Sequence, residues 1–274
     1  MHDADWQQVR QGEVDFYRIP SFAAFSFVRH GFSTRAGGVS KPPFDAMNLS
    51  FSRGDDPAAV TENFRRFCGA VGVSEHDLVL AAQTHGTALH YATEQDRGNG
   101  FDRPNPLRQI DGLVTDRPGV VLCTQYADCV PLFFLDPEKR VIALSHAGWR
   151  GTAADIAGAT VRRMQQQFGC DPRRMLAGIG PSIGPCCFEV DAPVYDVFAR
   201  SGLPTEGWYR KKGEKYYVDL WQVNQLLLQK AGLTAEHISA ARLCTHCRPD
   251  VFWSHRTTGP TRGSLAAVLA LTEE

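Results

Sequence analysis

A histidine followed closely by an aromatic and a basic residue ends an apolar run in "RVIALSHAGWRGTAADIAGATVRR", residues 140–163. His146 closes the run, and Trp149 and Arg150 stand in the short connection before a helical pattern begins. The packing of a core rarely requires these residue types in so short a connection. We therefore interpret the segment as part of a functional site.

A predicted β-hairpin brings a cysteine next to this histidine. Two apolar runs over residues 130–145 flank Asp-Pro-Glu-Lys, which is typical of a hairpin turn. If Leu135 pairs with Arg140, then Cys129 lies directly opposite His146. Opposed residues point to one face with Cβ atoms about 4.5–5.5 Å apart, which suits two ligands of one metal ion. A shift of the register by one residue would remove this pairing.

A second histidine could supply a third ligand. His85 in "AAQTHGT" also ends an apolar strand-like run and is followed by glycine. Two histidines and one cysteine make a Zn²⁺ site with an open fourth position, as in catalytic rather than structural zinc sites. Such an ion can lower the pKa of a bound water to about 7. The structural alternative is a small core cysteine with separate, hydrogen-bonded histidines.

The segment "CTHCRPD", residues 244–250, has the spacing of a metal-binding motif. A zinc ribbon needs a second Cys-x-x-Cys pair. The adjacent cysteines of "PCC", residues 185–187, do not have that spacing. The missing pair favours buried structural cysteines at a strand end over a metal centre.

The connection after His146 could also bind an anion. Thr152 is a predicted N-cap, so a helix N-terminus with free N–H groups would lie close to the histidine. Arg150 would add a bidentate donor for phosphate or carboxylate, and Trp149 a flat apolar face for a ring. A core tryptophan beside a surface arginine explains these two residues equally well.

Two further loops are glycine-rich and could approach a ligand closely. They are "STRAGGVS", residues 33–40, which contains Arg35, and "GIGPSIGPCC", residues 178–187. Either loop alone is a weak indication, because glycine-rich loops are common.

The composition is that of an ordinary globular protein. Of 274 residues, 43% are hydrophobic and 22% charged, and the formal net charge is −1, so nothing indicates a nucleic-acid partner. The sequence shows neither a signal peptide nor an apolar run long enough to span a membrane. We therefore expect a cytoplasmic protein whose eight cysteines are reduced rather than paired in disulfides.

The elements that must position these residues alternate between strands and helices. Helical spacing of apolar residues predicts helices over residues 57–72, 152–168 and 219–232. Strand-like runs occur at 21–38, 77–86, 111–125, 173–187, 238–247 and 264–271, besides the hairpin. Without a linker long enough to divide the chain, the pattern predicts one α/β domain over residues 1–274 with a mixed sheet.

Several motifs together resemble the polyphenol-oxidase laccase-domain family, whose members are also called purine nucleoside phosphorylase of the laccase-domain type or peptidoglycan editing factor. The motifs are "HGFSTRAGGVS", "NLS", "QTHG", "DCVPLFF", "HAGWRGT", "GPSIGPCCFEV" and "CTHC…FWSHR", within about residues 24–270. The resemblance implies layered mixed β-sheets flanked by helices, similar to a cysteine-hydrolase-like layered fold. It also implies zinc-dependent phosphorolysis of adenosine, inosine and methylthioadenosine, and deamination of adenosine.

Residue by residue, the resemblance carries the metal ligands onto His85, Cys129 and His146, the three residues reached above. The family usually closes with the order Thr-Gly-Arg, whereas here "TGPTRGSL" places Arg262 before its glycine. We expect Arg262 to bind substrate or phosphate.

For the reaction itself we expect Asp128 to be a catalytic carboxylate, with Asp111 as another carboxylate to consider. Arg35 is expected to act in catalysis by holding phosphate together with Arg150, while Trp149 contacts the nucleoside. Zinc is the expected metal and copper the less favoured one, because the nine histidines include no His-x-His pair and no axial ligand is evident. The usual nucleobase deaminase signature is also absent.

Two other functions fit the same residues. In a metal-free cysteine hydrolase acting on peptidoglycan precursors, Cys129 would be the nucleophile and His146 its base. A non-catalytic nucleotide-binding module would bind ligand without turnover. The expected partners are purine nucleosides and phosphate, and the oligomeric state stays open.

Overall fold

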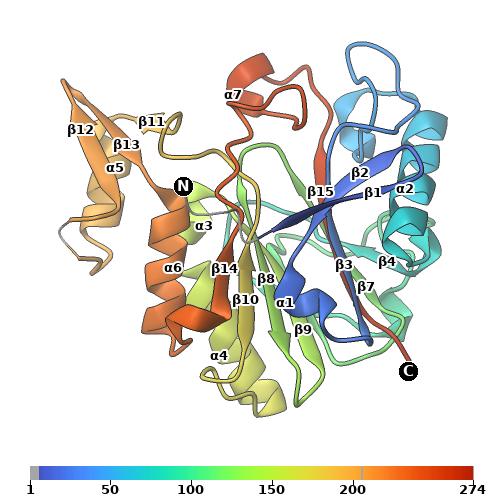
Figure 1. The fold of residues 1–274 in the computed structure, drawn as a ribbon, viewed down its shortest axis with the longest axis horizontal. Helices are drawn as coiled ribbons and strands as arrows, with labels where there is room; N and C mark the ends of the chain where they lie inside the picture. Colours follow the sequence, from blue (N-terminus) through green and yellow to red (C-terminus); the bar gives the residue numbers. More distant parts are fainter. Residues whose placement is uncertain (1–5, 205, 274) are drawn as a thin grey trace.

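Two six-stranded mixed sheets pack face to face in the computed structural model, which describes residues 6–204 and 206–273 (Figure 1). The first sheet has the order β1 (Gln7–Gln11), β2 (Val14–Arg18), β3 (Val28–Ser33), β15 (Leu265–Leu271), β7 (Val121–Tyr126), β4 (Leu78–Leu80). The second has the order β14 (Ile238–Ala240), β10 (Leu176–Ile179), β8 (Val130–Asp136), β9 (Val141–Ala147), β6 (Gly112–Thr115), β5 (Leu89–Tyr91).

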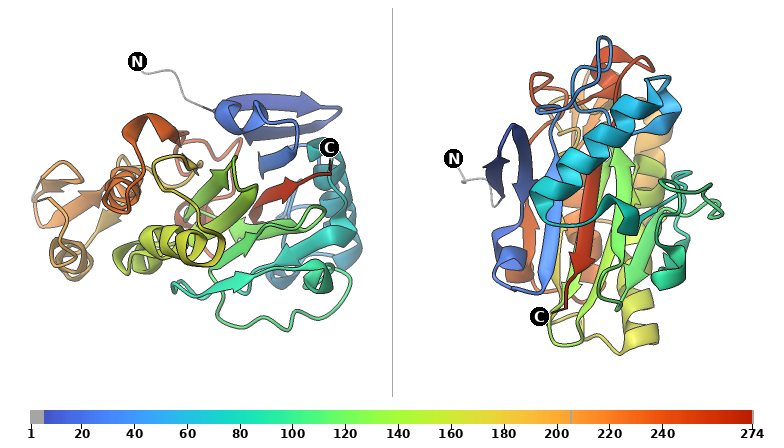
Figure 2. Two further views of the ribbon diagram at one scale, coloured as in Figure 1. Left: turned by 90° about the horizontal axis from the view of Figure 1, so that it is seen from below. Right: turned by 90° about the vertical axis from the view of Figure 1, so that its right-hand side faces the viewer.

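Helices cover the outer faces of both sheets. The α-helices are α1 (Pro20–Ala23), α2 (Pro57–Val71), α3 (Trp149–Ala153), α4 (Ile156–Phe168), α5 (Ala192–Ala199), α6 (Leu220–Lys230) and α7 (His255–Thr258). Short 3₁₀ helices are η1 (Phe51–Arg53), η2 (Glu75–Asp77), η3 (Glu94–Asp96) and η4 (Ala235–His237). Helix α2 lies against the first sheet, and α4 and α6 lie against the second (Figures 1 and 2). The expected α/β fold with layered mixed sheets flanked by helices is confirmed.

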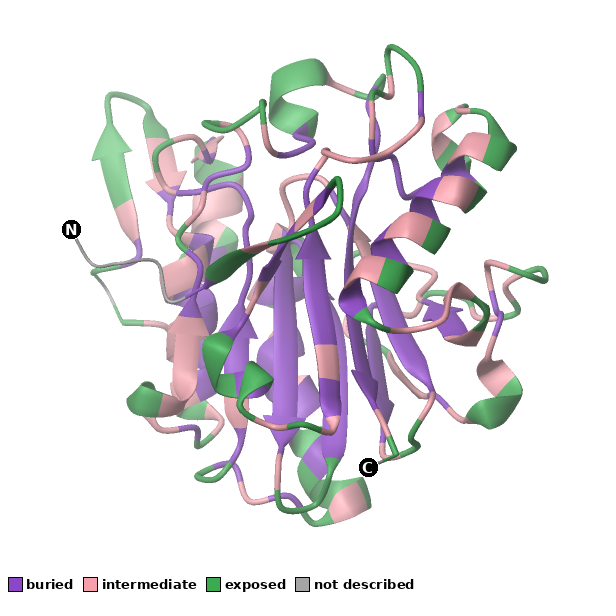
Figure 3. Cartoon of the chain, turned by 45° about the vertical axis from the view of Figure 1, so that its right-hand side comes forward, coloured by how far each residue is buried: buried purple, intermediate pink, exposed green. Residues whose placement is uncertain are grey.

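The core has one apolar layer between the sheets and one under each set of helices. Phe133 and Leu265 belong to the layer between the sheets, Phe64 to the layer under α2, and Val161 to the layer under α4 and α6. Every residue of β8, β9 and β15 is buried, as Figure 3 shows for the central strands. These strands are covered on both faces, which explains their continuous apolar runs.

A third, three-stranded sheet lies at one end of the molecule with α5 beside it (Figure 1). Its order is β11 (Glu189–Val190), β13 (Lys215–Val218), β12 (Tyr209–Lys212). The predicted single domain over residues 1–274 extends over positions 1–5, 205 and 274, which lie outside the described residues. Within the described residues, every helix is too short or too polar to cross a membrane.

The β8–β9 hairpin forms, but the register expected from the sequence is wrong by two residues. Leu135 pairs with Ile142 rather than Arg140, and Pro131 rather than Cys129 pairs with His146. The reason is the turn: the Asp136 carboxylate accepts hydrogen bonds from the next backbone N–H groups while Asp136 itself stays in the ladder. Because side chains alternate with a period of two, this shift leaves Cys129 and His146 on one face as diagonal neighbours.

The single helix expected over 152–168 is two helices. Asp155 takes a left-handed backbone conformation (φ 63°) and caps α4 by accepting a hydrogen bond from the Gly158 N–H. Thr152 is therefore not an N-cap: it is buried inside α3, and its hydroxyl donates to the Ala147 carbonyl. The strand expected over 21–38 is also shorter, because α1 occupies its beginning.

Candidate functional site

Three side chains from distant segments converge between the sheets. His85 follows β4, Cys129 directly precedes β8, and His146 lies in β9; their ligand atoms are all within 4.8 Å of one another. The two imidazole rings meet edge to face with centroids 5.0 Å apart. His146 is buried, Cys129 is half-buried and His85 is exposed, so the group opens to solvent on one side. We call these three residues the His-Cys-His group.

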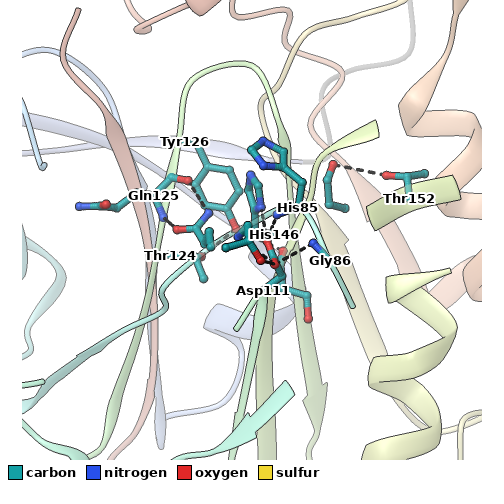
Figure 4. Close-up of polar contacts among 12 residues, drawn as sticks. His85, Gly86, Asp111, Thr124, Gln125, Tyr126, His146 and Thr152 are labelled. Atoms are coloured by element: carbon teal, nitrogen blue, oxygen red, sulfur yellow. Dashed lines mark hydrogen bonds and ion pairs between the residues drawn. The ribbon is translucent and has the colours of Figure 1, made fainter. Parts of the chain in front are cut away.

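Asp111, which directly precedes β6, holds two members of this group in place (Figure 4). Its Oδ1 accepts hydrogen bonds from Nδ1 of His146 and from the backbone N–H of His85, both at 2.9 Å. Its Oδ2 accepts from the backbone N–H groups of Thr84 and Gly86. Burial opposes the charge of Asp111, but these hydrogen bonds keep its pKa well below its usual range. Nδ1 of His146 is thereby committed to Asp111, which leaves Nε2 for another partner.

Cys129 and His146 form a pair of opposite charge. Burial alone would raise the pKa of the Cys129 thiol, but His146 and His85 lower it to about 6. Burial alone would lower the pKa of His146, but Cys129 and Asp111 raise it to about 9. At neutral pH the pair therefore holds a thiolate, which is the form that binds metal ions and the form that acts as a nucleophile.

Gly148 is required beside the His-Cys-His group. A Cβ at this position would lie 2.6 Å from Cδ2 of His85 and 3.3 Å from Sγ of Cys129. The glycine of "HAGW" thus lets α3 begin directly against both side chains.

Two cavities meet at the group. An apolar cavity of about 320 Å³ is walled by Trp149, Ile183, Phe188 and Leu220. A second cavity of about 490 Å³ is lined by three arginines, Arg53, Arg108 and Arg262, and we call it the arginine cavity. His85, Cys129 and Arg262 line both. A ligand that spans the two cavities would therefore pass directly over Cys129.

Arg262 brings a buried positive charge to this junction, close enough to Asp128 and Cys129 to be attracted by both. It is buried, and its Nη1 donates hydrogen bonds to the Gly263 carbonyl and the Ser264 hydroxyl. Its buried Nε has no hydrogen-bond partner. Burial and the nearby charge of Arg53 lower the pKa of Arg262 to about 10. Arg53 also donates a hydrogen bond to the Ser264 hydroxyl. The positive charges of Arg53 and Arg262 therefore lie close together and favour binding of an anion in the arginine cavity.

Of the other three residues expected to contact substrate, one lines a cavity and two do not. Trp149 lines the apolar cavity. Arg150 is exposed and lies over the Trp149 ring, 4.2 Å from its centroid, outside the lining of both cavities. Arg35 is also outside both linings: it packs over Trp253 and donates to the carbonyls of Asp45 and Pro249. Neither Arg35 nor Arg150 is brought to the His-Cys-His group.

Asp128 lines the apolar cavity, but both oxygens of its carboxylate are engaged. Oδ1 accepts from the Thr245 hydroxyl and Oδ2 from the backbone N–H of Arg256, both at 2.7 Å. The Asp128 carbonyl accepts from the Ile183 N–H. Asp128 therefore ties helix α7 and two loops together around the cavity, which is a positioning role.

Sequence reasoning missed several residues that line the cavities. They are Arg53 and Arg108 in the arginine cavity and Phe188, His255 and Arg256 in the apolar cavity. The signal that could have found three of them was present, because Phe188, His255 and Arg256 stand inside "GPSIGPCCFEV" and "FWSHR". Arg53 ends η1 and Arg108 lies in a loop, and neither stands inside such a pattern.

Comparison with known proteins finds a matching family, similar chains and a similar solved structure. The family model described as Multi-copper polyphenol oxidoreductase laccase matches residues 29–272. The chain is 39% identical to purine nucleoside phosphorylase YlmD of Geobacillus stearothermophilus, over 89% of this chain and 90% of that protein. It is 32% identical to purine nucleoside phosphorylase YlmD of Bacillus subtilis, over 98% of this chain and 93% of that protein. The crystal structure of YlmD from Geobacillus stearothermophilus superposes with a TM-score of 0.91 at 36% identity, covering 98% of this chain and 100% of that one.

Proposed function

The chain belongs to the multi-copper polyphenol oxidoreductase laccase family, and from this premise we propose that it is a metal-dependent purine nucleoside phosphorylase. The curated relatives named above carry that activity in their names. The observation that carries the proposal is the meeting of an apolar and an arginine-lined cavity at the His-Cys-His group. A nucleoside and phosphate need these two environments side by side.

The two cavities suit the two substrates. Phosphorolysis joins phosphate to C1′ of the ribose while the bond from C1′ to the purine nitrogen breaks and the base leaves. Trp149 and Phe188 offer flat apolar surfaces for the base. Arg262 and Arg53 hold the phosphate by charge-assisted hydrogen bonds. Their positive charge also favours approach of the anion to the sugar.

The donor set fits a zinc ion. Two imidazoles and one thiolate leave a fourth position open. Asp111 holds Nδ1 of His146, so that Nε2 is the nitrogen left for the ion, as carboxylates behind histidine ligands do in zinc sites. When bound, the ion would supply a Lewis-acid charge at the junction of the cavities. Copper is the less favoured metal for this donor set.

We extend the proposal to the substrates adenosine, inosine and methylthioadenosine, and to deamination of adenosine. Deamination replaces the amino group at C6 with oxygen from water and releases ammonia, so it needs the cavity for the base and no phosphate. The same protein preparation can therefore be assayed for both phosphorolysis and deamination. Purified protein would be incubated with each nucleoside, with and without phosphate, and the products separated. Free base that forms only with phosphate supports the proposal, and no base release from any nucleoside by metal-loaded protein rejects it.

A second function is favoured by one observation, the closeness of the Cys129 sulfur to the His146 imidazole, which lowers the pKa of the thiol. This is the pair that a metal-free cysteine hydrolase requires. As a zinc ligand, Cys129 would be alkylated slowly by iodoacetamide until a chelator removes the metal. As a free nucleophile it would be alkylated fast with or without chelator. A fast, chelator-independent rate at the Cys129 peptide, together with activity that survives chelation, favours the hydrolase.

A further inference from the structure

Four cysteines gather at a second place, away from the His-Cys-His group. Cys186 and Cys187 lie in the loop between β10 and β11, and Cys244 and Cys247 lie in the loop after β14. Their sulfur atoms are all within 4.8 Å of one another, and Sγ of Cys247 lies 3.5 Å from Cys186 and 3.4 Å from Cys187. We call these residues the four-cysteine cluster.

We propose that the four-cysteine cluster binds a structural Zn²⁺ ion as a closed tetrathiolate site. With Zn–S bonds of about 2.3 Å, a tetrahedral site holds its sulfurs about 3.8 Å apart. Two sulfur separations in the cluster are 3.4 and 3.5 Å and none exceeds 4.8 Å, so modest side-chain rotations would surround one ion. All four positions are filled by protein, which is the mark of structural rather than catalytic zinc.

Packing alone does not explain the cluster. Free cysteine is among the most buried residue types, because its side chain behaves as a small apolar group. Here only Cys244 is buried, whereas Cys186 and Cys247 are exposed and Cys187 is half-buried. The interpretation as buried structural cysteines therefore accounts for one residue of the four.

Backbone pairing holds the two loops of the cluster side by side. Strands β10 and β14 are parallel neighbours, so the loops that follow them leave the same edge of the sheet. A further β-bridge joins Ser182 to Cys244. The Gly184 N–H donates to Sγ of Cys244 at 3.2 Å, a hydrogen bond that stabilises a thiolate. The second cysteine pair that a zinc ribbon takes from a Cys-x-x-Cys motif is supplied here by two adjacent residues.

The four-cysteine cluster lies next to the wall of the apolar cavity. Ile183 and Phe188, on either side of the cysteine pair, form part of the wall of the apolar cavity. Arg256, which lines the same cavity, donates hydrogen bonds to the carbonyls of Cys187 and Glu189. An ion in the cluster would fix this wall, and ligation would release the thiol protons to solvent.

The test counts metal in the full chain. With both sites loaded, elemental analysis should find about two zinc ions per chain, and about one after Cys129→Ala. In the Cys129→Ala background, Cys247→Ser and Cys244→Ser should each remove the remaining zinc, whereas Cys170→Ser, a free cysteine outside both sites, should not. Co²⁺ loaded into Cys129→Ala should give thiolate-to-cobalt charge transfer and tetrahedral visible bands that Cys247→Ser abolishes.

A measurement on the unaltered chain covers the case in which a variant fails to fold. Alkylation read by peptide mass spectrometry should be slow at Cys186 and Cys247 with zinc and fast after chelation, although both are exposed. Fast alkylation in zinc-loaded protein overturns the proposal. So does a disulfide between Cys247 and Cys186 or Cys187 in protein purified with reductant, and so does stoichiometric iron in place of zinc.

Discussion

Nδ1 of His146 lies 2.9 Å from Oδ1 of Asp111, and both side chains are buried. The same carboxylate also accepts hydrogen bonds from the backbone N–H groups of Thr84, His85 and Gly86. One buried group therefore sets the orientation of one imidazole and the backbone of the loop that carries the other. Geometry at the His-Cys-His group depends on Asp111 although it is not a member of the group.

Asp111→Asn should weaken metal binding. An amide offers one acceptor oxygen and places an NH₂ group where N–H donors already point, so His146 loses its fixed tautomer. Loss of such a partner typically costs about 10- to 100-fold in metal affinity. Competition with a chelator of known affinity measures this change. The matched control is Asp116→Asn, because the Asp116 carboxylate accepts a hydrogen bond from the Tyr91 hydroxyl and belongs to neither site. Unchanged affinity in Asp111→Asn would remove the positioning role from this residue.

Arg53→Met and Arg262→Met should impair phosphorolysis of adenosine more than its deamination. A hydrogen bond to a charged group contributes about 1.5–3 kcal/mol, so release of adenine should fall roughly tenfold to over a hundredfold. Formation of inosine needs no phosphate and should change less. Arg173→Met is the matched control, because Arg173 is exposed, pairs with Asp171 and lines neither cavity. Equal losses in both reactions would mean that Arg53 and Arg262 shape the site rather than hold phosphate.

Gly148→Ala should displace the metal ligands while the sheets stay intact. The new methyl group would stand 2.6 Å from a ring carbon of His85, closer than carbon atoms approach without a shift. Metal content per folded chain should fall. In Gly69→Ala, the added methyl group meets no atom within 4 Å on the surface of α2, so it should leave metal content unchanged. Full metal content in Gly148→Ala would show that His85 moves aside freely.

Stability should fall with pH below neutrality because of His30 in β3. Burial and the charge of Arg18 lower the pKa of His30 to about 3, and its Nε2 accepts a hydrogen bond from the Ile19 N–H. Between this pKa and the unfolded value near 6.5, the unfolded chain binds a proton that the folded chain does not, so stability rises with pH across that window. Lowering the pH from about 7 to about 5.5 should therefore reduce the free energy of unfolding by about 1 kcal/mol through this group.

His30→Gln isolates this contribution, since an amide oxygen can accept the same hydrogen bond without titrating. Urea unfolding at both pH values should show a smaller pH effect in the variant than in the wild type. Identical pH effects in the two proteins would assign the titration to other groups.

Some features of the site follow from the sequence by itself. The spacing of Val60, Phe64 and Phe67 predicts α2, because a helix repeats every 3.6 residues and these side chains share one face. The two apolar runs around Asp136 predict the β8–β9 hairpin. The placing of Cys129 and His146 on one face survives the two-residue error in register, because faces depend only on whether a shift is odd or even.

Other features were decided only by the tertiary structure. The register itself depends on how the Asp136 carboxylate binds the turn, and the division of α3 from α4 depends on the left-handed backbone at Asp155. Arg53 and Arg262 share a cavity, and their segments meet through Ser264, to which Arg53 donates a hydrogen bond. The four cysteines meet because β14 pairs with β10. Local periodicity specifies an element and its buried face, but strands buried on both faces carry no local mark of their neighbours, so only long-range packing brings these residues together.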